Sequence, residues 1–599
     1  MLFQIIQDRE QVSIMMDNAI ISFGKFNKQK IKINRKMRKI SFYALLAGLV
    51  FAAASCSNLK PLSQSNFNAT PSPLETVGNS VPVTVNGTFP EKWFNKNATV
   101  KITPVLKYAG TKESYGSAQA YQGENVSGNA IEIPYNRGGN FNMSFTFPYQ
   151  PDMLTSELFM RFDAKIKNKS VKLPEVKVAD GIVATSALAS AQTTAPSVAD
   201  DGFQRIIKQT QDANIHFVIQ QANIRSSETN TQDMRSWQQR VQDAFNDPRQ
   251  NVDIEISAYA SPDGGLTLNE RLAAQREKNT TQYLEGELKR RKIDTDVNAR
   301  YTAQDWEGFR QLLEASDLQD KELVLRVLSM YPDPETRERE IKNISFVYSD
   351  LASTILPQLR RSRITANIEI IGKSDEEIME FWRANPKKLS VEELLYASTL
   401  TDNDADKEKI YQYVTVNFPQ DYRGWNNMAT AYYQRGEYNN AKQALDRAAL
   451  VSPNAAEVNV NKALFAMMDG NTQSAKELLG RSSGANNLEA AMGLLYLMEG
   501  DYNQAVDAFG DTKSNNAALA QILTKNYNAA DITLKAIKNP DALTYYLMAV
   551  VGSRTNNFND VMTNLRSAIT MDKTMATRAL NDLEFAKYRT NQDFMTLLR

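Results

Sequence analysis

The chain of 599 residues offers few side chains for metal binding or nucleophilic catalysis. It contains one cysteine, Cys56, and one histidine, His216. Zinc sites of the Cys/His type need three or four such ligands, so the counts exclude them. Ser-His-Asp or Cys-His catalysis would depend on His216, which lies in an alternating segment typical of a half-buried strand. Carboxylate-based hydrolysis stays formally open, but no spacing identifies an acidic pair. We therefore predict that the protein is not an enzyme and has no cofactor or metal.

The single thiol lies at the end of an apolar N-terminal run. Arg38 and Lys39 precede an apolar stretch over residues 40–54, and Ala-Ala-Ser comes directly before Cys56. A basic start, a short apolar run and small residues are typical of a signal peptide, and the run is short for a membrane span. The final four residues resemble the lipobox of bacterial lipoproteins, with Ala53 where Leu is commonest.

The lipobox resemblance implies that diacylglycerol is attached to Cys56, which becomes the first residue after cleavage. Residues 1–55 would then be an upstream extension plus the signal peptide, with Met37 as the true start. Several acyl chains give stable membrane anchoring. Some Gram-negative lineages export lipoproteins to the surface through acidic residues after the cysteine, but Ser-Asn-Leu-Lys-Pro follows here. We predict a lipid anchor in the outer membrane, on the periplasmic face.

Composition divides the next part of the chain into three segments. Residues 56–80 are rich in Ser, Asn, Pro and Thr, which predicts a flexible tether. Residues 81–183 hold short alternating or β-branched runs separated by Gly, Asn and Pro, which predicts a β-sandwich. Residues 184–204 are a low-complexity stretch of Ala, Ser and Thr, which predicts a linker. None of the three carries a recognisable chemical motif.

The sequence pattern changes over residues 205–373, where strand-like runs alternate with helical ones. This alternation predicts an α/β sandwich. Within them, the stretch 254–284 resembles the peptidoglycan-binding domain of the OmpA family, which carries Asn-x-x-Leu-Ser-x-x-Arg on a helix. Here that helix runs from Asn269 to Arg276. The Arg-rich stretch 360–364 resembles the last strand of the family, and a helical insert is expected before it, near residues 303–358.

The OmpA resemblance implies a specific chemistry. In the family, an Asp and an Arg fifteen residues later hold the zwitterionic end of diaminopimelate, the carboxylate taking the ammonium and the guanidinium the carboxylate. Arg276 falls on the Arg position, but Ser261 falls on the Asp position. Asp263 could substitute if the turn bends it inward, and Asn269 matches the Asn that braces the loop. These four residues are the predicted peptidoglycan-binding set; the alternative is a scaffold domain in which Arg276 is a solvated helix residue.

The last third of the chain, residues 390–599, contains repeats of roughly 34 residues. The best copy reads Trp425-x-x-Met-Ala-x-x-Tyr432, followed by Gly436 and Ala441-x-x-x-Leu. It resembles the tetratricopeptide pattern, and further copies follow. The pattern predicts an α-solenoid whose concave groove binds peptides or folded partners. Candidate groove residues in the best copy are Asn426, Asn427, Tyr433 and Arg447.

The charge balance argues against nucleic acid as a ligand. Lys plus Arg and Asp plus Glu both count 69, so nothing in the composition favours nucleic acid. From the parts together we predict a periplasmic adaptor, anchored to the outer membrane, that binds peptidoglycan through the OmpA-like domain and an unknown protein through the repeats. The alternative is an assembly scaffold of an outer-membrane secretion, import or fimbrial machine without peptidoglycan binding. A carboxylate-dependent glycan hydrolase is the least favoured possibility.

Overall fold

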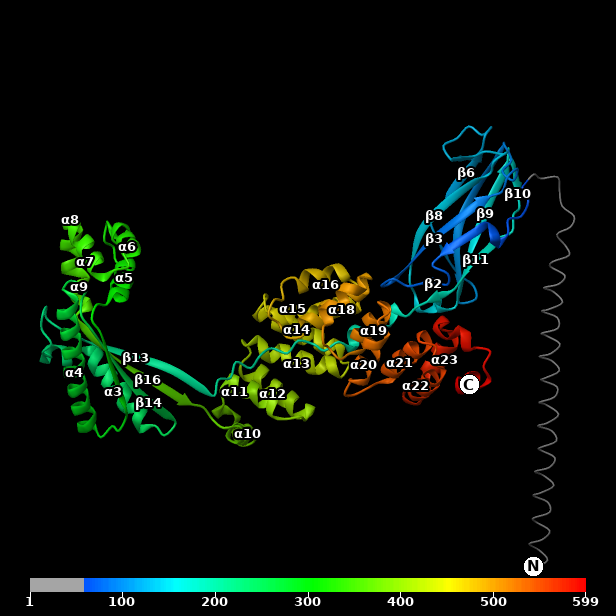
Figure 1. Cartoon of the computed structure of the whole chain (residues 1–599). Coiled ribbons are helices and arrows are strands. Elements are labelled where there is room, and N and C mark those ends of the chain that lie inside the picture. The colour runs from blue at the N-terminus through cyan, green and yellow to red at the C-terminus, as the bar shows by residue number, and fades with distance from the viewer. Residues whose placement is uncertain (1–58) are drawn as a thin grey trace, which may run out of the picture. The chain divides into compact units, whose positions relative to one another are not determined.

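The computed structural model describes residues 59–599, so Cys56 and the predicted signal peptide lie outside the described residues (Figure 1). The chain divides into two compact units. Of the described residues, unit 1 contains those up to Ala195, together with Ala463–Gly480 and Asn487–Arg599, and unit 2 contains Pro196–Lys462 and Arg481–Asn486. No helix between residues 59 and 599 is both long enough and apolar enough to cross a membrane.

Unit 1 begins with a β-rich region of antiparallel sheets. One sheet has the strand order β1-β3-β8 and a larger one the order β10-β9-β4-β6-β7, with β11 pairing β9 and β5 pairing β4. Buried and exposed residues alternate along β3 and β8, as expected for strands with one face on a core. The strands are β1 (Phe67–Thr70), β3 (Ser80–Phe89), β4 (Ala98–Tyr108), β5 (Lys112–Tyr115), β6 (Gln119–Gly123), β7 (Ile131–Ile133), β8 (Gly139–Pro148), β9 (Ser156–Ile166), β10 (Lys169–Val171) and β11 (Val176–Asp180).

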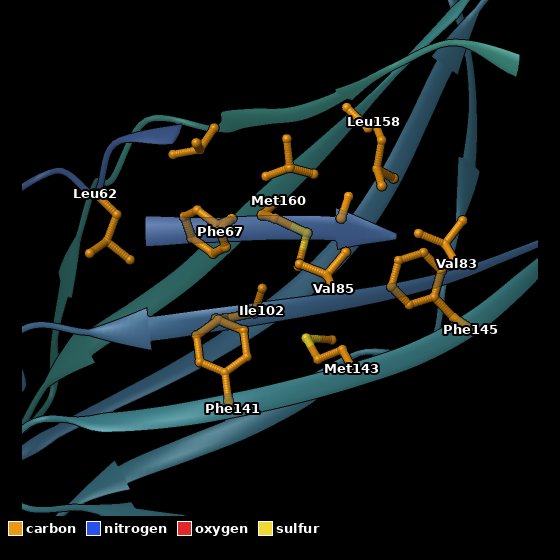
Figure 2. Close-up of a cluster of buried hydrophobic side chains, with 14 of the residues drawn as sticks. Leu62, Phe67, Val83, Val85, Ile102, Phe141, Met143, Phe145, Leu158 and Met160 are labelled. Atoms are coloured by element: carbon orange, nitrogen blue, oxygen red, sulfur yellow. The ribbon is translucent and has the colours of Figure 1, made fainter. Parts of the chain in front are cut away.

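Side chains from both sheets form one buried cluster. Figure 2 shows Val85 and Phe141 from the smaller sheet beside Ile102, Leu158 and Met160 from the larger one. Each of these five side chains is almost completely removed from solvent. Burial of a side chain of this size stabilises the fold by about 1.5–3 kcal/mol. The predicted β-sandwich is thus a β-rich domain with a single apolar core.

The segment predicted as a tether, residues 56–80, belongs to this core over its described part. Leu62 and Phe67 are buried among the sandwich residues (Figure 2), as are Leu59 and Leu74. β1 pairs with β3, and β2 (Leu74–Glu75) pairs in parallel with β12 (Ile182–Val183). The prediction of a flexible tether was wrong here because the few apolar residues, not the more numerous polar ones, decide whether such a segment packs.

The rest of unit 1 is helical. Consecutive helices pack as pairs, and small residues allow the close approach: a Cβ at Gly493 would lie 2.8 Å from the Phe509 ring. The helices are α16 (Thr472–Leu479), α17 (Leu488–Glu499), α18 (Tyr502–Phe509), α19 (Asn515–Leu523), α20 (Tyr527–Lys535), α21 (Ala542–Arg554), α22 (Phe558–Met571), α23 (Thr574–Asn581) and α24 (Gln592–Leu597). The helix α15 (Ala456–Met468) is shared between the two units.

Unit 2 begins with an α/β domain. Its sheet has the strand order β13-β16-β14-β15, in which only β14 and β15 are parallel. The strands are β13 (Ile206–His216), β14 (Gln250–Tyr259), β15 (Val297–Thr302) and β16 (Arg361–Ile371). The helices α3 (Gln232–Asn246) and α4 (Leu266–Arg291) share one buried cluster with the sheet, including Trp237, Ile256 and Leu284. One face of the sheet therefore carries both helices.

A helical insert separates β15 from β16 and has a buried cluster of its own around Phe309, Ile341 and Leu351. It consists of α5 (Trp306–Glu314), α6 (Lys321–Met330), α7 (Pro334–Asn343), α8 (Ser345–Thr354) and α9 (Leu356–Leu359). After the sheet the chain is helical, as the repeats predict. Unit 2 contributes α10 (Asp375–Ala384), α11 (Val391–Ala397), α12 (Asp404–Asn417), α13 (Tyr422–Gln434) and α14 (Tyr438–Val451).

Candidate functional site

The predicted peptidoglycan-binding residues lie together at the turn between β14 and α4. Asn269 and Arg276 are seven residues apart, two helical turns, so they share one face of α4. Both are buried. The Asn269 Nδ2 donates to the carbonyl oxygens of Ser261, at 3.0 Å, and Gly264, at 2.7 Å. Asn269 thus braces the turn, which is the role that the OmpA resemblance implies for it.

The Arg276 guanidinium is bound by main-chain carbonyls of its own domain. Its Nε, Nη1 and Nη2 donate to the oxygens of Gln221, Tyr259 and Val218, at 3.0, 2.8 and 3.4 Å respectively. Its exposed fraction is 1%, and burial lowers its pKa to about 10, with Arg360 as a second cause. The reading of Arg276 as a solvated helix residue is therefore wrong. The arginine instead ties α4 to the end of β14 and to the loop after β13.

Asp263 does turn inward, but its partner is another arginine of the chain. The Arg360 Nη2 donates to the Asp263 carboxylate at 2.9 Å, and the Arg360 Nε donates to the Ser261 Oγ at 3.3 Å. The Ser261 hydroxyl also donates to the Asp263 carboxylate. The side chains of the ion pair are only 11% and 13% exposed. The turn thus forms a compact, internally neutralised polar cluster with Arg360.

Three further charged residues hold this region, and none of them was among the predicted site residues. The Arg361 Nη2 lies 3.1 Å from the Asp305 carboxylate, and both side chains are buried. Asp305 also accepts from the Gly308 amide at 2.9 Å, which caps α5. From α7, the Lys342 Nζ donates to the Asp263 carbonyl at 3.1 Å. The signal in the sequence was the Arg-rich stretch at the start of β16, whose partners only the fold reveals.

The single histidine lies at the end of β13, half exposed, with its Nδ1 3.6 Å from the Glu228 carboxylate. Burial lowers its pKa, whereas Glu228 raises it. Within residues 59–599 no cluster of His, Cys, Asp or Glu side chains is arranged to hold a metal ion. His216 is thus a partly buried strand residue beside a carboxylate.

A second polar site involves the segment predicted as a linker, residues 184–204. In unit 2 its main chain is held by asparagines of the first helices of the repeats. The Ala199 amide donates to the Asn427 Oδ1 at 2.8 Å, and the Asn427 Nδ2 donates to the Ala199 carbonyl at 3.0 Å. The same arrangement joins Asn461 to Ser197, at 2.7 Å for both bonds. We call each such pair of bonds a backbone clamp.

The third backbone clamp lies in unit 1. The Ser190 amide donates to the Asn516 Oδ1 at 3.1 Å, and the Asn516 Nδ2 donates to the Ser190 carbonyl at 2.8 Å. The Asn516 Nδ2 also reaches the Thr194 hydroxyl at 3.0 Å. The segment predicted as a linker is therefore bound along its main chain, which its low-complexity composition does not reveal.

The three clamp asparagines occupy one position of the repeat. Each lies two residues before a buried alanine of its helix, and these alanines are Ala429, Ala463 and Ala518. Asparagine suits the position because its amide offers one acceptor and two donors, which match the C=O and N–H of one residue. The two clamp bonds contact only main-chain atoms of the bound residue, so the bonds themselves do not select for its side chain. The recurrence every 34 residues between Asn427 and Asn461 was the signal available in the sequence.

Further contacts hold the segment in unit 2. The Asn426 Nδ2 donates to the Ser197 carbonyl at 3.0 Å, and the Arg423 Nη1 donates to the Asp201 carbonyl at 2.7 Å. The Asn486 Nδ2 contacts the Val198 carbonyl at 3.2 Å and the Asp200 carboxylate at 3.0 Å.

The groove candidates from the sequence divide into two groups. Asn426 and Asn427 do line the groove, but they are buried beneath the segment rather than exposed. Tyr433 is buried and packs its ring against Tyr438, with 5.6 Å between ring centroids. Arg447 is exposed on α14, the second helix of its repeat. The last two are therefore outside the clamp set.

Comparison with known proteins finds similarity to solved structures at low sequence identity. No family model matches the sequence, and no curated protein matches it. Among solved structures, the chain is similar to a tetratricopeptide repeat protein from Parabacteroides merdae, with 13% identity over 34% of this chain and 88% of that one, at a TM-score of 0.26. It is also similar to PilW, a type IV pilus biogenesis factor, with 12% identity over 38% and 96% and a TM-score of 0.23. The Cut9-Hcn1 hetero-tetramer gives 15% identity over 53% and 65%, at 0.30.

Proposed function

We propose that the protein is a lipid-anchored scaffold of the outer membrane, facing the periplasm, whose repeats hold a protein partner. In this proposal the α/β domain does not bind peptidoglycan. The observation that carries the proposal is the pair of backbone clamps made by Asn427 and Asn461, because they are built to hold an extended polypeptide. The anchor rests on the lipobox resemblance at Cys56.

We choose a scaffold over a peptidoglycan adaptor because Asp263 and Arg276, the two charged residues that would bind the ligand, already have partners within the chain. A diaminopimelate zwitterion needs a free carboxylate and a free guanidinium. Asp263 is paired with Arg360, and Arg276 donates to three carbonyls. Breaking a buried ion pair costs about 3–5 kcal/mol. A micromolar site supplies only about 8 kcal/mol in total, so that cost removes most of the affinity.

Sedimentation with purified sacculi tests this choice. The soluble chain of residues 57–599 should stay in the supernatant when it is centrifuged with sacculi. The variant Arg276→Lys keeps a positive charge but loses the planar guanidinium group. The control is Arg271→Ala, which changes an exposed arginine of the same helix. Circular dichroism of each variant verifies the fold.

Sedimentation of the wild type would overturn the proposal. If Arg276→Lys abolished the sedimentation while Arg271→Ala kept it, the protein would be the peptidoglycan adaptor, with Arg276 released from its carbonyls on binding. Recovery of the wild type from the supernatant, at the level of a protein without affinity for the cell wall, supports the scaffold.

A further inference from the structure

The groove of unit 2 holds its occupant almost entirely through the main chain. Residues Ser197 and Ala199 are clamped by Asn461 and Asn427, and alternate residues of an extended chain point to the same side. Both clamped residues are buried, with exposed fractions of 0% and 2%, whereas the intervening Val198 is 37% exposed. The groove therefore admits small side chains at two alternate positions and leaves the position between them open to solvent.

The internal segment is not the best occupant of this groove. The Ser197 hydroxyl is buried and has no hydrogen-bond partner. A buried hydroxyl without a partner has lost its hydration and gained nothing in return. Alanine at the same place would keep both clamp bonds and remove the unsatisfied oxygen. A second polypeptide with alanine there would thus fit the groove better than the chain's own segment does.

We propose that this groove is an exchangeable peptide site, which the chain fills with residues 196–201 as an internal ligand. The partner would present an extended segment with small residues at two alternate positions, alanine at the first, and replace the internal one. The proposal rests on the proposed function as a protein-binding scaffold, and it adds the chemistry of the partner and a barrier to its entry.

The barrier follows from the covalent connection of the internal ligand. A tethered segment competes at an effective concentration of about a millimolar or more. A free peptide of equal intrinsic affinity therefore hardly enters at micromolar concentration. The preference for alanine over serine at the first clamp is one feature by which a partner overcomes this competition.

The first test empties the groove. In the full chain of residues 57–599, residues 196–201 are replaced by Gly and Ser in equal number, so that the connection keeps its length. A fluorescein-labelled peptide with the sequence of residues 194–203 is then titrated and followed by anisotropy. We expect binding to the emptied chain and at least about a hundredfold weaker binding to the wild type. A peptide with Ser197→Ala should bind the emptied chain about tenfold more tightly.

Matched variants show whether the peptide uses the clamps. Asn461→Ala in the emptied chain should weaken binding at least about tenfold, because two hydrogen bonds are lost. Asn439→Ala, at an exposed position on α14, should leave binding unchanged. An emptied chain that keeps its helical content but does not bind the peptide would overturn the proposal, as would equal binding by the emptied chain with and without Asn461→Ala.

A second measurement uses the intact chain, in case the emptied one does not fold. Excess Ser197→Ala peptide should raise amide hydrogen exchange in residues 196–201, because the displaced segment loses its clamps. Unchanged exchange at saturating peptide would mean that the segment is a fixed part of the fold. That outcome would leave the scaffold function itself untouched, since sedimentation with sacculi tests it separately.

Discussion

Asn461 holds Ser197 through both ends of one side-chain amide, with the Ser197 N–H on Oδ1 and the Ser197 C=O on Nδ2, each at 2.7 Å. The two residues are 264 positions apart in the sequence. Ser197 has an exposed fraction of 0% and Asn461 of 3%. Water therefore cannot easily replace either bond, and the pair should contribute measurably to the stability of unit 2.

Removing this clamp gives the first prediction. Asn461→Ala leaves the buried Ser197 N–H without a partner and the Ser197 C=O with the Asn426 Nδ2 alone, so the free energy of unfolding should fall by about 1–3 kcal/mol. Urea unfolding followed by circular dichroism measures it. Asn439→Ala, exposed on α14, should change it by less than about 0.5 kcal/mol. Equal effects of the two substitutions would contradict a structural role for the clamp.

The polar cluster at the β14–α4 turn gives the second prediction. Asp263→Ala leaves the Arg360 guanidinium poorly solvated and without its carboxylate, so stability should fall by about 3 kcal/mol. Glu307→Gln breaks an exposed pair with Arg310 on α5 and should have a much smaller effect, since solvent screens such pairs. Unfolding of both variants and the wild type in guanidinium chloride measures the two losses of stability. A negligible effect of Asp263→Ala would mean that the ion pair is not formed in solution.

Two glycines give opposite predictions. A Cβ at Gly493 would lie 2.8 Å from the Phe509 ring, so Gly493→Val should overpack the contact between α17 and α18 and cost about 1–3 kcal/mol. Around Gly286, within α4, nothing lies within 4 Å of an added Cβ, so Gly286→Ala should stabilise the helix by about 0.5–1 kcal/mol. Thermal unfolding of the two variants should shift in opposite directions. A shared direction would argue against the predicted packing.

Asp582 gives a prediction on pH. Burial raises the pKa of its carboxyl group, whose Oδ2 accepts from the Tyr546 hydroxyl at 2.6 Å. In the unfolded chain the pKa returns to about 3.9. The folded state then binds more protons, so this group's contribution to stability is complete below the unfolded pKa and is lost as the pH rises through the folded one.

The comparison that isolates this contribution is Asp582→Asn against the wild type. The variant does not titrate at this position, so the wild type should lose stability relative to it as the pH rises from about 4 toward the raised pKa. Thermal melts of both proteins at several pH values give the difference. A difference that stays constant over this range would mean that the carboxyl group is not perturbed.

The lipid anchor gives the last prediction. Cys56→Ala removes the only thiol of the chain, so the protein should move from the membrane fraction to the soluble fraction and lose incorporation of labelled fatty acid. Ser57→Ala, the adjacent substitution, should leave both unchanged. Retention of the Cys56→Ala protein in membranes would show that another part of the chain holds it there.

The sequence by itself determined the local structure of most of the protein. Buried alanine and glycine at fixed intervals, such as Ala429 and Ala441, predict helix pairs because only small residues allow the two helices to approach. Alternation along β3 predicts a strand with one buried face for an equally local reason. These patterns depend on neighbours within a few residues or one repeat, and the chain order alone contains them.

The tertiary structure decided what the polar residues do. Arg276 looks the same in sequence whether it meets a ligand, water or the carbonyls of Val218 and Gln221, which lie more than fifty residues away. The segment around Ser197 has the composition of a linker, yet asparagines far along the chain take its peptide groups. Hydrogen bonds act over about 3 Å, so their partners are fixed by which distant segments the fold brings together, and residue type and spacing do not contain that information.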